Sequence, residues 1–198
     1  MVGGDRRITT LGAVAIAIAV LGAVTGCAGS NVDASSSVVS DATLAQSKSY
    51  AQLLRNEASS RLPPIVLKEV AQSSDVSVAC DETSDDPDGL VRSWTSSTSI
   101  LITNSTASRI QKVADDLIAS FVDQGWSADV DESSAEALTV TELTSKASLA
   151  SIEIATASKA AGQAPAITIT ATGVCALTGG PDSDEVTKLE AQEPANAG

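Results

Sequence analysis

Apolar residues between positions 110 and 121 recur at i, i+3, i+4, i+7, i+8 and i+11, the spacing of one helix face. This pattern predicts an amphipathic helix that begins after a cap at Asn104 or Thr106. Gly125 suits the C′ position at the end of the helix. The stripe comprises Ile110, Val113, Ala114, Leu117, Ile118 and Phe121.

A second helix is predicted over residues 42–61, with Asp41 as its N-cap. Pro63 and Pro64 follow it, and neither can continue a helix. Its apolar stripe is less regular, because Ser47 interrupts it. The stripe comprises Leu44, Tyr50, Leu53, Leu54 and Ala58.

Several other segments alternate apolar and polar residues, which predicts strands with one buried face. With the helices they predict an α+β fold: a two-layer sandwich in which two helices cover one face of an antiparallel sheet of about four to five strands. The alternating apolar residues are Val76, Val78 and Cys80; Trp94, Ile100 and Ile102; Trp126, Ala128 and Val130; Leu138 and Val140; Ile152 and Ile154; and Ile167, Ile169, Ala171, Gly173 and Cys175.

The N-terminus has the layout of an export signal. Arg6 and Arg7 precede an uncharged apolar run, Leu11 to Val24, which is too short for a comfortable membrane span. The run ends in Val24-Thr25-Gly26-Cys27, which resembles the lipobox of bacterial lipoproteins, although Leu is commoner than Val at position 24. The resemblance implies cleavage before Cys27 and a diacylglyceryl group on its thiol. Such an anchor would hold the chain on the extracytoplasmic face of the cell membrane.

Two alternatives to the lipobox stay open: an ordinary secretory signal with a chance cysteine, and an uncleaved anchor. Arg6-Arg7 also permits twin-arginine export. General secretion is favoured, because Thr9 and Thr10 displace the apolar residue expected after the arginine pair.

Composition divides the chain into four parts. Residues 1–26 form the predicted signal peptide, and the Ser-rich residues 27–41 form a lipidated flexible tether. Residues 42–178 form a single α+β domain. Residues 179–198 are expected to be a disordered acidic tail, because they open with Gly-Gly-Pro and contain few large apolar residues.

The charge balance narrows the choice of partner. The chain carries 12 Lys+Arg and 25 Asp+Glu, for a net charge of -13. This acidity excludes nucleic acid, whose phosphates would be repelled, and argues against membrane binding through a basic patch. The absence of His excludes imidazole-based catalysis and imidazole metal ligands.

Two cysteines are left if Cys27 is lipidated. Cys80 and Cys175 each occupy an apolar position in an alternating segment, so both are expected on the buried face. The compartment outside the membrane permits oxidation. We therefore predict a Cys80–Cys175 disulfide, with two buried free thiols as the alternative. In the chain-entropy model, closing so long a loop contributes about 4–5 kcal/mol.

Five acidic residues crowd the segment 81–88, and carboxylate oxygens are ligands that Ca²⁺ prefers. Only Asp86 and Asp88 fall at EF-hand positions when Gly89 takes the glycine position, so these two are candidates for weak calcium binding. The simpler interpretation is a solvated acidic turn, and we expect no cofactor and no other metal site. The five are Asp81, Glu82, Asp85, Asp86 and Asp88.

Other candidates for chemistry are ambiguous. No Ser-x-x-Lys motif occurs, which leaves a β-lactamase-like site unsupported. Asp115-Asp116 or Asp129 with Asp131 could serve glycoside hydrolysis, but nothing in the sequence distinguishes them from exposed charges.

Two further motifs each have a simpler structural interpretation. Trp94 and Trp126 could line a ligand cleft, although a core position is favoured. Residues 104–106 match a glycosylation sequon, but a turn and helix cap is favoured.

The Ala-, Thr- and Ser-rich body loosely resembles small uncharacterised lipoproteins of actinobacterial cell envelopes. We expect a non-catalytic module that binds an envelope protein or a small ligand through the helix-free sheet face or the segment from Trp94 to Ile102. The alternative is a carboxylate-dependent hydrolase of cell-wall polymers, which requires converging carboxylates. A two-lobed solute-binding protein is disfavoured by the chain length.

Overall fold

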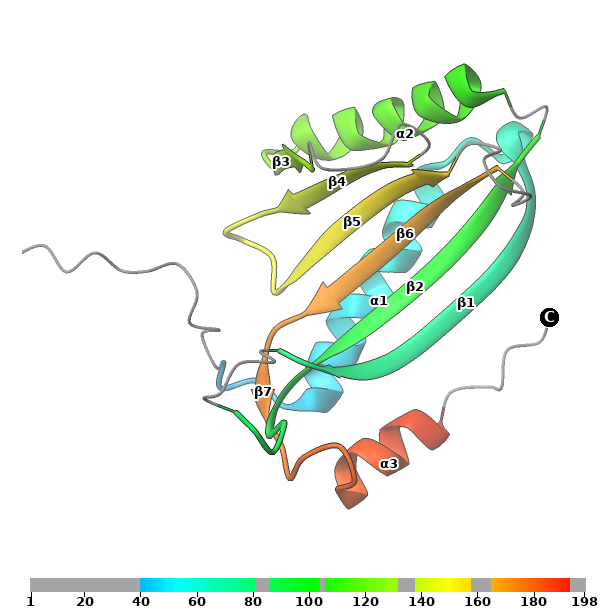
Figure 1. Ribbon diagram of the computed structural model, residues 1–198. Coiled ribbons are helices and arrows are strands. Elements are labelled where there is room, and N and C mark those ends of the chain that lie inside the picture. The colour runs from blue at the N-terminus through cyan, green and yellow to red at the C-terminus, as the bar shows by residue number, and fades with distance from the viewer. Residues whose placement is uncertain (1–39, 81–85, 104–105, 132–137, 158–164, 193–198) are drawn as a thin grey trace, which may run out of the picture. The chain divides into compact units, whose positions relative to one another are not determined.

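The computed structural model of the protein describes residues 40–80, 86–103, 106–131, 138–157 and 165–192, all within one compact unit, Ser36–Gly198. In this part of the chain three α-helices pack against one open antiparallel sheet of seven strands (Figure 1). The predicted α+β class is confirmed. The predicted number of strands, four to five, was wrong.

Three α-helices and one 3₁₀ helix are present in the described residues: α1 (Leu44–Arg61), η1 (Pro64–Val66), α2 (Ala107–Val122) and α3 (Asp184–Ala191). The strands are β1 (Leu67–Ala79), β2 (Val91–Ile102), β3 (Ser127–Val130), β4 (Leu138–Thr144), β5 (Ala150–Ala157), β6 (Ala166–Gly173) and β7 (Ala176–Leu177).

The strands lie in the order β1-β2-β6-β5-β4-β3, and the short β7 pairs with β2. The six alternating segments of the sequence fall in or next to strands β1 to β6, so the predicted count was lower than these segments themselves imply. The alternation covers only the second half of β1, because its first six residues are all exposed. Strand β7 is only two residues long.

Helices α1 and α2 lie on the same face of the sheet, as predicted. The Cβ direction of Gly173 in β6 meets the Ser47 carbonyl of α1. Thr156 of β5, which shares the buried parity of Ile152 and Ile154, donates to Gln111 of α2 at 3.3 Å. Figure 1 shows α1 crossing behind the sheet and α2 on the β3–β5 side.

The core between the sheet and the two helices uses the few aromatic residues of the chain. Trp94 and Phe121 are fully buried, which confirms the core interpretation of Trp94. Trp126 is half-buried and meets Phe121 edge to face, with ring centroids 5.3 Å apart. Ile100, Ile152, Ile154, Ile167 and Ile169 fill the sheet side of this core.

The predicted α2 stripe is confirmed except that Ile118 is only partly buried. Thr106 is the N-cap, and its hydroxyl accepts from the Arg109 amide. Asn104 and Ser105 lie outside the described residues. Gly125 has a φ of 88°, which favours glycine, two residues beyond the C-cap Asp123.

Helix α1 is rotated relative to the predicted stripe. Leu53 is 67% exposed, whereas Ser47 and Lys48 are buried, because both polar groups find partners inside. The predicted cap Asp41 was also wrong. Thr43 caps the helix, since its hydroxyl and the Gln46 side chain form a reciprocal capping box.

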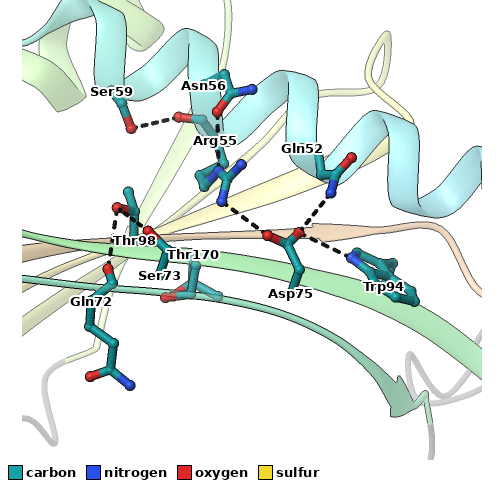
Figure 2. Close-up of polar contacts among 11 residues, drawn as sticks. Gln52, Arg55, Asn56, Ser59, Gln72, Ser73, Asp75, Trp94, Thr98 and Thr170 are labelled. Atoms are coloured by element: carbon teal, nitrogen blue, oxygen red, sulfur yellow. Dashed lines mark hydrogen bonds and ion pairs between the residues drawn. The ribbon is translucent and has the colours of Figure 1, made fainter. Parts of the chain in front are cut away.

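Strand β1 shows the opposite parity from the one predicted. Val76 is 42% exposed, and Ser77 is buried instead. The reason is Asp75, whose carboxylate points under α1 and accepts hydrogen bonds there (Figure 2). Once Asp75 faces the helix, Val76 must face the other side of the sheet.

The predicted disulfide joins Cys80, after β1, to Cys175, between β6 and β7, with the Cα atoms 6.0 Å apart. The Cys80 amide donates to the Val91 carbonyl of β2, and the Cys175 carbonyl accepts from the amide of Ser40, which precedes α1. The bridge therefore links two segments that are far apart in sequence at one end of the sheet.

Residues 184–191 form α3, so the prediction of a disordered tail from residue 179 was wrong for this segment. Ser183 caps the helix, and Asp184 and Glu185 in the first turn suit its dipole. Val186 is 1% exposed and anchors the helix in the core. A single buried apolar residue in an acidic segment is a weak sequence signal.

Candidate functional site

A buried polar network joins α1 to β1 and β2 (Figure 2). The Asp75 carboxylate, 8% exposed, accepts from Arg55 Nη1 at 3.1 Å, Gln52 Nε2 at 3.2 Å and Trp94 Nε1 at 3.2 Å. Three donors satisfy a buried carboxylate, which is what its burial requires. The network is fully engaged and holds the helix on the sheet.

Lys48 lies near the N-terminal end of α1 and contacts α3. Its Nζ donates to the Leu189 carbonyl at 2.7 Å and lies 4.6 Å from the centre of the Trp94 ring. A cation near the last carbonyls of α3 suits the helix dipole. The Glu190 carboxylate accepts from the Ser77 amide on the outer edge of β1. These contacts hold α3 over the edge strand, where unpaired backbone groups are otherwise exposed.

Asp86, one of the two calcium candidates, forms a turn. The two Asp86 oxygens accept from the amides of Leu90 and Val91, both at 2.8 Å, so this carboxylate closes the turn before β2. Asp88 is exposed beside it, and the segment 81–85 lies outside the described residues. Among the described residues no three acids or cysteines are placed to hold a metal ion.

The helix-free face of the sheet is hydroxyl-rich at its centre. Across β2 and β6, Ser97 and Thr170 lie 3.1 Å apart, and Thr168 donates to Ser99 at 3.2 Å. The hydroxyl groups of these cross-strand pairs therefore hydrogen-bond to each other. Trp94, Ile100 and Ile102 of the segment from Trp94 to Ile102 face the core, so they are unavailable as the contact surface proposed for that segment. Leu101 has the opposite parity and is partly exposed.

Three carboxylates lie side by side on the same face. Asp129 of β3 is in register with Glu142 of β4, and Glu142 is in register with Glu153 of β5. We call these three residues the acidic row. With Asp131 they line an open hollow of about 440 Å³. Like charges directly opposite one another destabilise a sheet.

A groove of about 300 Å³ lies between the end of α1 and one side of α2. Its floor is apolar: Leu62 and Val66 from the segment after α1, and Val113 and Leu117 from α2. These four side chains belong to the core and are at most 9% exposed. At the groove, the core comes close to the surface.

The rim of the groove is basic, which is unusual for so acidic a chain. Arg61 is fixed in place: it donates to Ser120 at 2.9 Å and to Gln124 at 2.7 Å, and it stacks 3.7 Å from the Phe121 ring centre. Lys112 pairs with Asp116 at 2.9 Å.

Arg109, the third cation of the rim, is exposed in the first turn of α2. Its guanidinium has no hydrogen bond or ion pair with any described residue. The rim therefore presents one uncommitted cation above an apolar floor.

Of the two other predicted carboxylate pairs, Asp129 and Asp131 both line the hollow beside the acidic row, whereas Asp115 and Asp116 form no site. Asp115 and Asp116 each bind the residue four positions earlier, Gln111 and Lys112. Asp116 lines the groove. Cys27 and most of the predicted tether lie outside the described residues. None of the described helices has the length and apolar composition needed to cross a membrane.

A scan against protein-family models found no match, and a search of curated proteins found none. Among solved structures, the chain is similar to LppA from Mycobacterium tuberculosis, a candidate lipoprotein known from a crystal structure. The identity is 12% over 76% of this chain and 83% of LppA, with a TM-score of 0.30. A likeness at this level carries no functional argument.

Sequence reasoning missed the groove, and of the acidic hollow it named Asp129 and Asp131 but not Glu142 or Glu153. Arg109, Lys112, Asp116 and Ser120 follow one another at helical spacing beside the apolar stripe, so a helical wheel of α2 places them on one side. Residues 61–66 cover that side of α2. Nothing in their own sequence predicts that they pack there. The acidic row depends on the registers of β3, β4 and β5, which a single sequence does not reveal.

Proposed function

We propose that this protein is a lipid-anchored, extracytoplasmic lipoprotein of the bacterial cell envelope, and that its domain is a non-catalytic module that binds a small ligand in the groove between α1 and α2. The anchor is supported by Val24-Thr25-Gly26-Cys27 behind an apolar run. The observation that carries the binding function is the apolar floor beneath a basic rim on a chain of net charge -13.

The groove has the composition of a binding site, with a mostly apolar lining and a few polar groups that orient a ligand. It lacks an arrangement for nucleophilic catalysis among its described residues. The Ser120 hydroxyl donates to the Leu117 carbonyl at 2.6 Å and accepts from Arg61 at 3.2 Å, and Asp116 is held by Lys112. No base therefore activates the hydroxyl.

The acidic row is the natural place for a carboxylate-dependent hydrolase. Glu142 and Glu153 are exposed on an open sheet face. A general acid of a glycosidase works in surroundings that keep it protonated near neutral pH, such as an apolar pocket. The open face offers no such surroundings, so binding is the function we propose.

The anchor is tested by mass spectrometry of the mature protein from its bacterial host. We expect an N-terminal peptide that begins at acylated Cys27, and recovery of the protein with membranes. The Cys27→Ala variant should remain unprocessed or leave the membrane fraction. A mature wild-type chain without acyl groups at position 27 would contradict the anchor.

The binding function is tested separately by hydrogen–deuterium exchange of the full-length protein in phosphatidylcholine nanodiscs. A small-molecule extract of the host envelope should protect residues 61–66 and 109–120. The Val113→Phe variant, which fills the groove, should lose this protection while its circular dichroism is unchanged. Protection confined to β3–β5 would place the ligand at the acidic row and contradict the proposal.

A further inference from the structure

We propose that the ligand of the groove is a single-chain anionic amphiphile of the fatty-acid class, with its carboxylate on Arg109 and its chain along Leu62, Val66, Val113 and Leu117. This inference rests on the proposed function, because it names the ligand of the same groove. It is argued from the size of the groove, its lining and its charge.

The size of the groove selects a narrow occupant. Its volume of about 300 Å³ is at the small end for ligand sites. From Arg109 to Ser120 the groove follows α2 over about 16 Å, at 1.5 Å of rise per residue. A volume this small over such a length fits one extended chain. A bound helix, about 10 Å across, requires a much wider groove.

The lining selects an apolar body. The four floor residues carry no polar side-chain atom, and they are continuous with the hydrophobic core. An apolar chain laid on this floor removes its own surface from water together with the small part of the floor that is still exposed, and burial of apolar surface is the dominant favourable term in such binding. A sugar or a nucleotide would leave its hydroxyl groups unpaired against the same floor.

The charge selects the head group. Arg61 and Lys112 are committed to partners on the protein, which leaves Arg109 as the cation available to a ligand. Arg109 stands in the first turn of α2, which contains no acidic residue, so the positive end of the helix dipole adds to its field. An anion bound at this position is attracted both by the guanidinium and by the positive end of the helix dipole.

One available guanidinium matches a carboxylate better than a phosphate. The planar fork of arginine fits carboxylate and phosphate oxygens alike, but a carboxylate carries a single charge, which one guanidinium balances. The charge of the rest of the protein also favours Arg109 as the position of the anion. The net charge is -13 and the acidic row lies on the opposite face, so the protein as a whole repels an anion that is not held at a local cation.

The test uses a photoreactive diazirine analogue of decanoate with the full-length protein in nanodiscs of zwitterionic phosphatidylcholine. We expect labelling, mapped by mass spectrometry, in residues 61–66 and 109–120. Decanoate should compete, whereas decanol and inorganic phosphate should not. Arg109→Gln should reduce labelling about five- to tenfold, the weight of one partly exposed charge-assisted contact. Lys146→Gln removes an exposed positive charge elsewhere and should leave labelling unchanged.

Each other outcome overturns a stated part of the inference. Equal labelling by the diazirine analogue of decanol would refute the role of the anion. Stronger competition by decyl phosphate than by decanoate would refute the carboxylate head group, and labelling spread over the surface would refute the groove. If the envelope extract protects the groove but decanoate does not label it, the ligand class is wrong and the proposed function stands. If neither occurs, both fail.

Discussion

The backbone amide of Trp94 donates to the hydroxyl of Ser47 at 3.0 Å, and both residues are completely buried. The contact joins α1 to β2 just beyond the end of the β2–β6 ladder, whose last paired residue on β2 is Thr95. Ser47 therefore accepts from this amide where the pairing of β2 with β6 has ended. A serine that interrupts the apolar stripe of α1 has a structural reason to be there.

Replacing Ser47 with alanine should lower the free energy of unfolding by about 1–3 kcal/mol, because a buried amide loses its acceptor. The matched control is Ser96→Ala. Ser96 is also completely buried, but its hydroxyl has no hydrogen-bond partner among the described residues. Removing it should leave stability unchanged or raise it by up to about 1 kcal/mol. Urea unfolding measures both. Equal losses in the two variants would mean that the hydroxyl of Ser47 does not matter.

Gly173 brings the same part of α1 onto β6. A Cβ atom at this position would lie 2.4 Å from the Ser47 carbonyl oxygen, which belongs to the backbone and cannot swing away. Gly173→Ala should therefore push the helix off the sheet and lower the free energy of unfolding by about 1–3 kcal/mol. Ala171→Gly, two residues earlier on the same face, is the control for flexibility and packing. Denaturant midpoints that do not differ between the Gly173→Ala variant and the wild type would show that the helix can move at no cost.

The acidic row predicts the opposite effect, a gain in stability on mutation. Glu142 faces Asp129 on one side and Glu153 on the other, so Glu142→Gln removes two cross-strand repulsions. The free energy of unfolding should rise by about 0.2–1 kcal/mol at low salt. The gain should shrink as salt screens these exposed charges.

The control for the acidic row is Glu69→Gln, which removes an equally exposed glutamate from β1, where it pairs with Leu101. Thermal unfolding of both variants at two salt concentrations separates the local repulsion from the general effect of lowering the negative charge. A gain of the same size at position 69 would assign the effect to net charge alone.

How well the sequence predicts each element depends on where its information lies. Helix α2 could be predicted almost residue by residue, because its apolar stripe, its cap Thr106 and Gly125 all lie within the segment. The burial of Ser47 in α1 could not, because it depends on an amide in β2. Likewise, the inward side of β1 follows from three donors to Asp75 on other elements, against the preference of Val76 for burial.

The groove likewise combines one part that the sequence predicts with another that it does not. One wall of the groove is a helix face that the sequence does encode, with Arg109 and Lys112 beside the apolar stripe. The other wall, from Leu62 to Val66, is set by the turn that leads from α1 into β1. Only the tertiary structure brings the two walls together, so the groove is invisible to periodicity. The disulfide was predictable because assigning Cys27 to the lipid anchor left a single pairing for the other two cysteines.

The Cys80–Cys175 disulfide yields the last prediction. The two cysteines are 95 positions apart in the sequence. In the chain-entropy model, a bridge that closes so long a loop removes much conformational entropy from the unfolded chain. Cys80→Ser, Cys175→Ser and the double variant should each lower the free energy of unfolding by about 2–5 kcal/mol, and by the same amount, because each breaks the same bond. Both cysteines are partly exposed, so a reductant should bring the wild-type protein to a similar stability. Urea unfolding with and without reductant measures these effects. Losses that add in the double variant would show that the two side chains act independently.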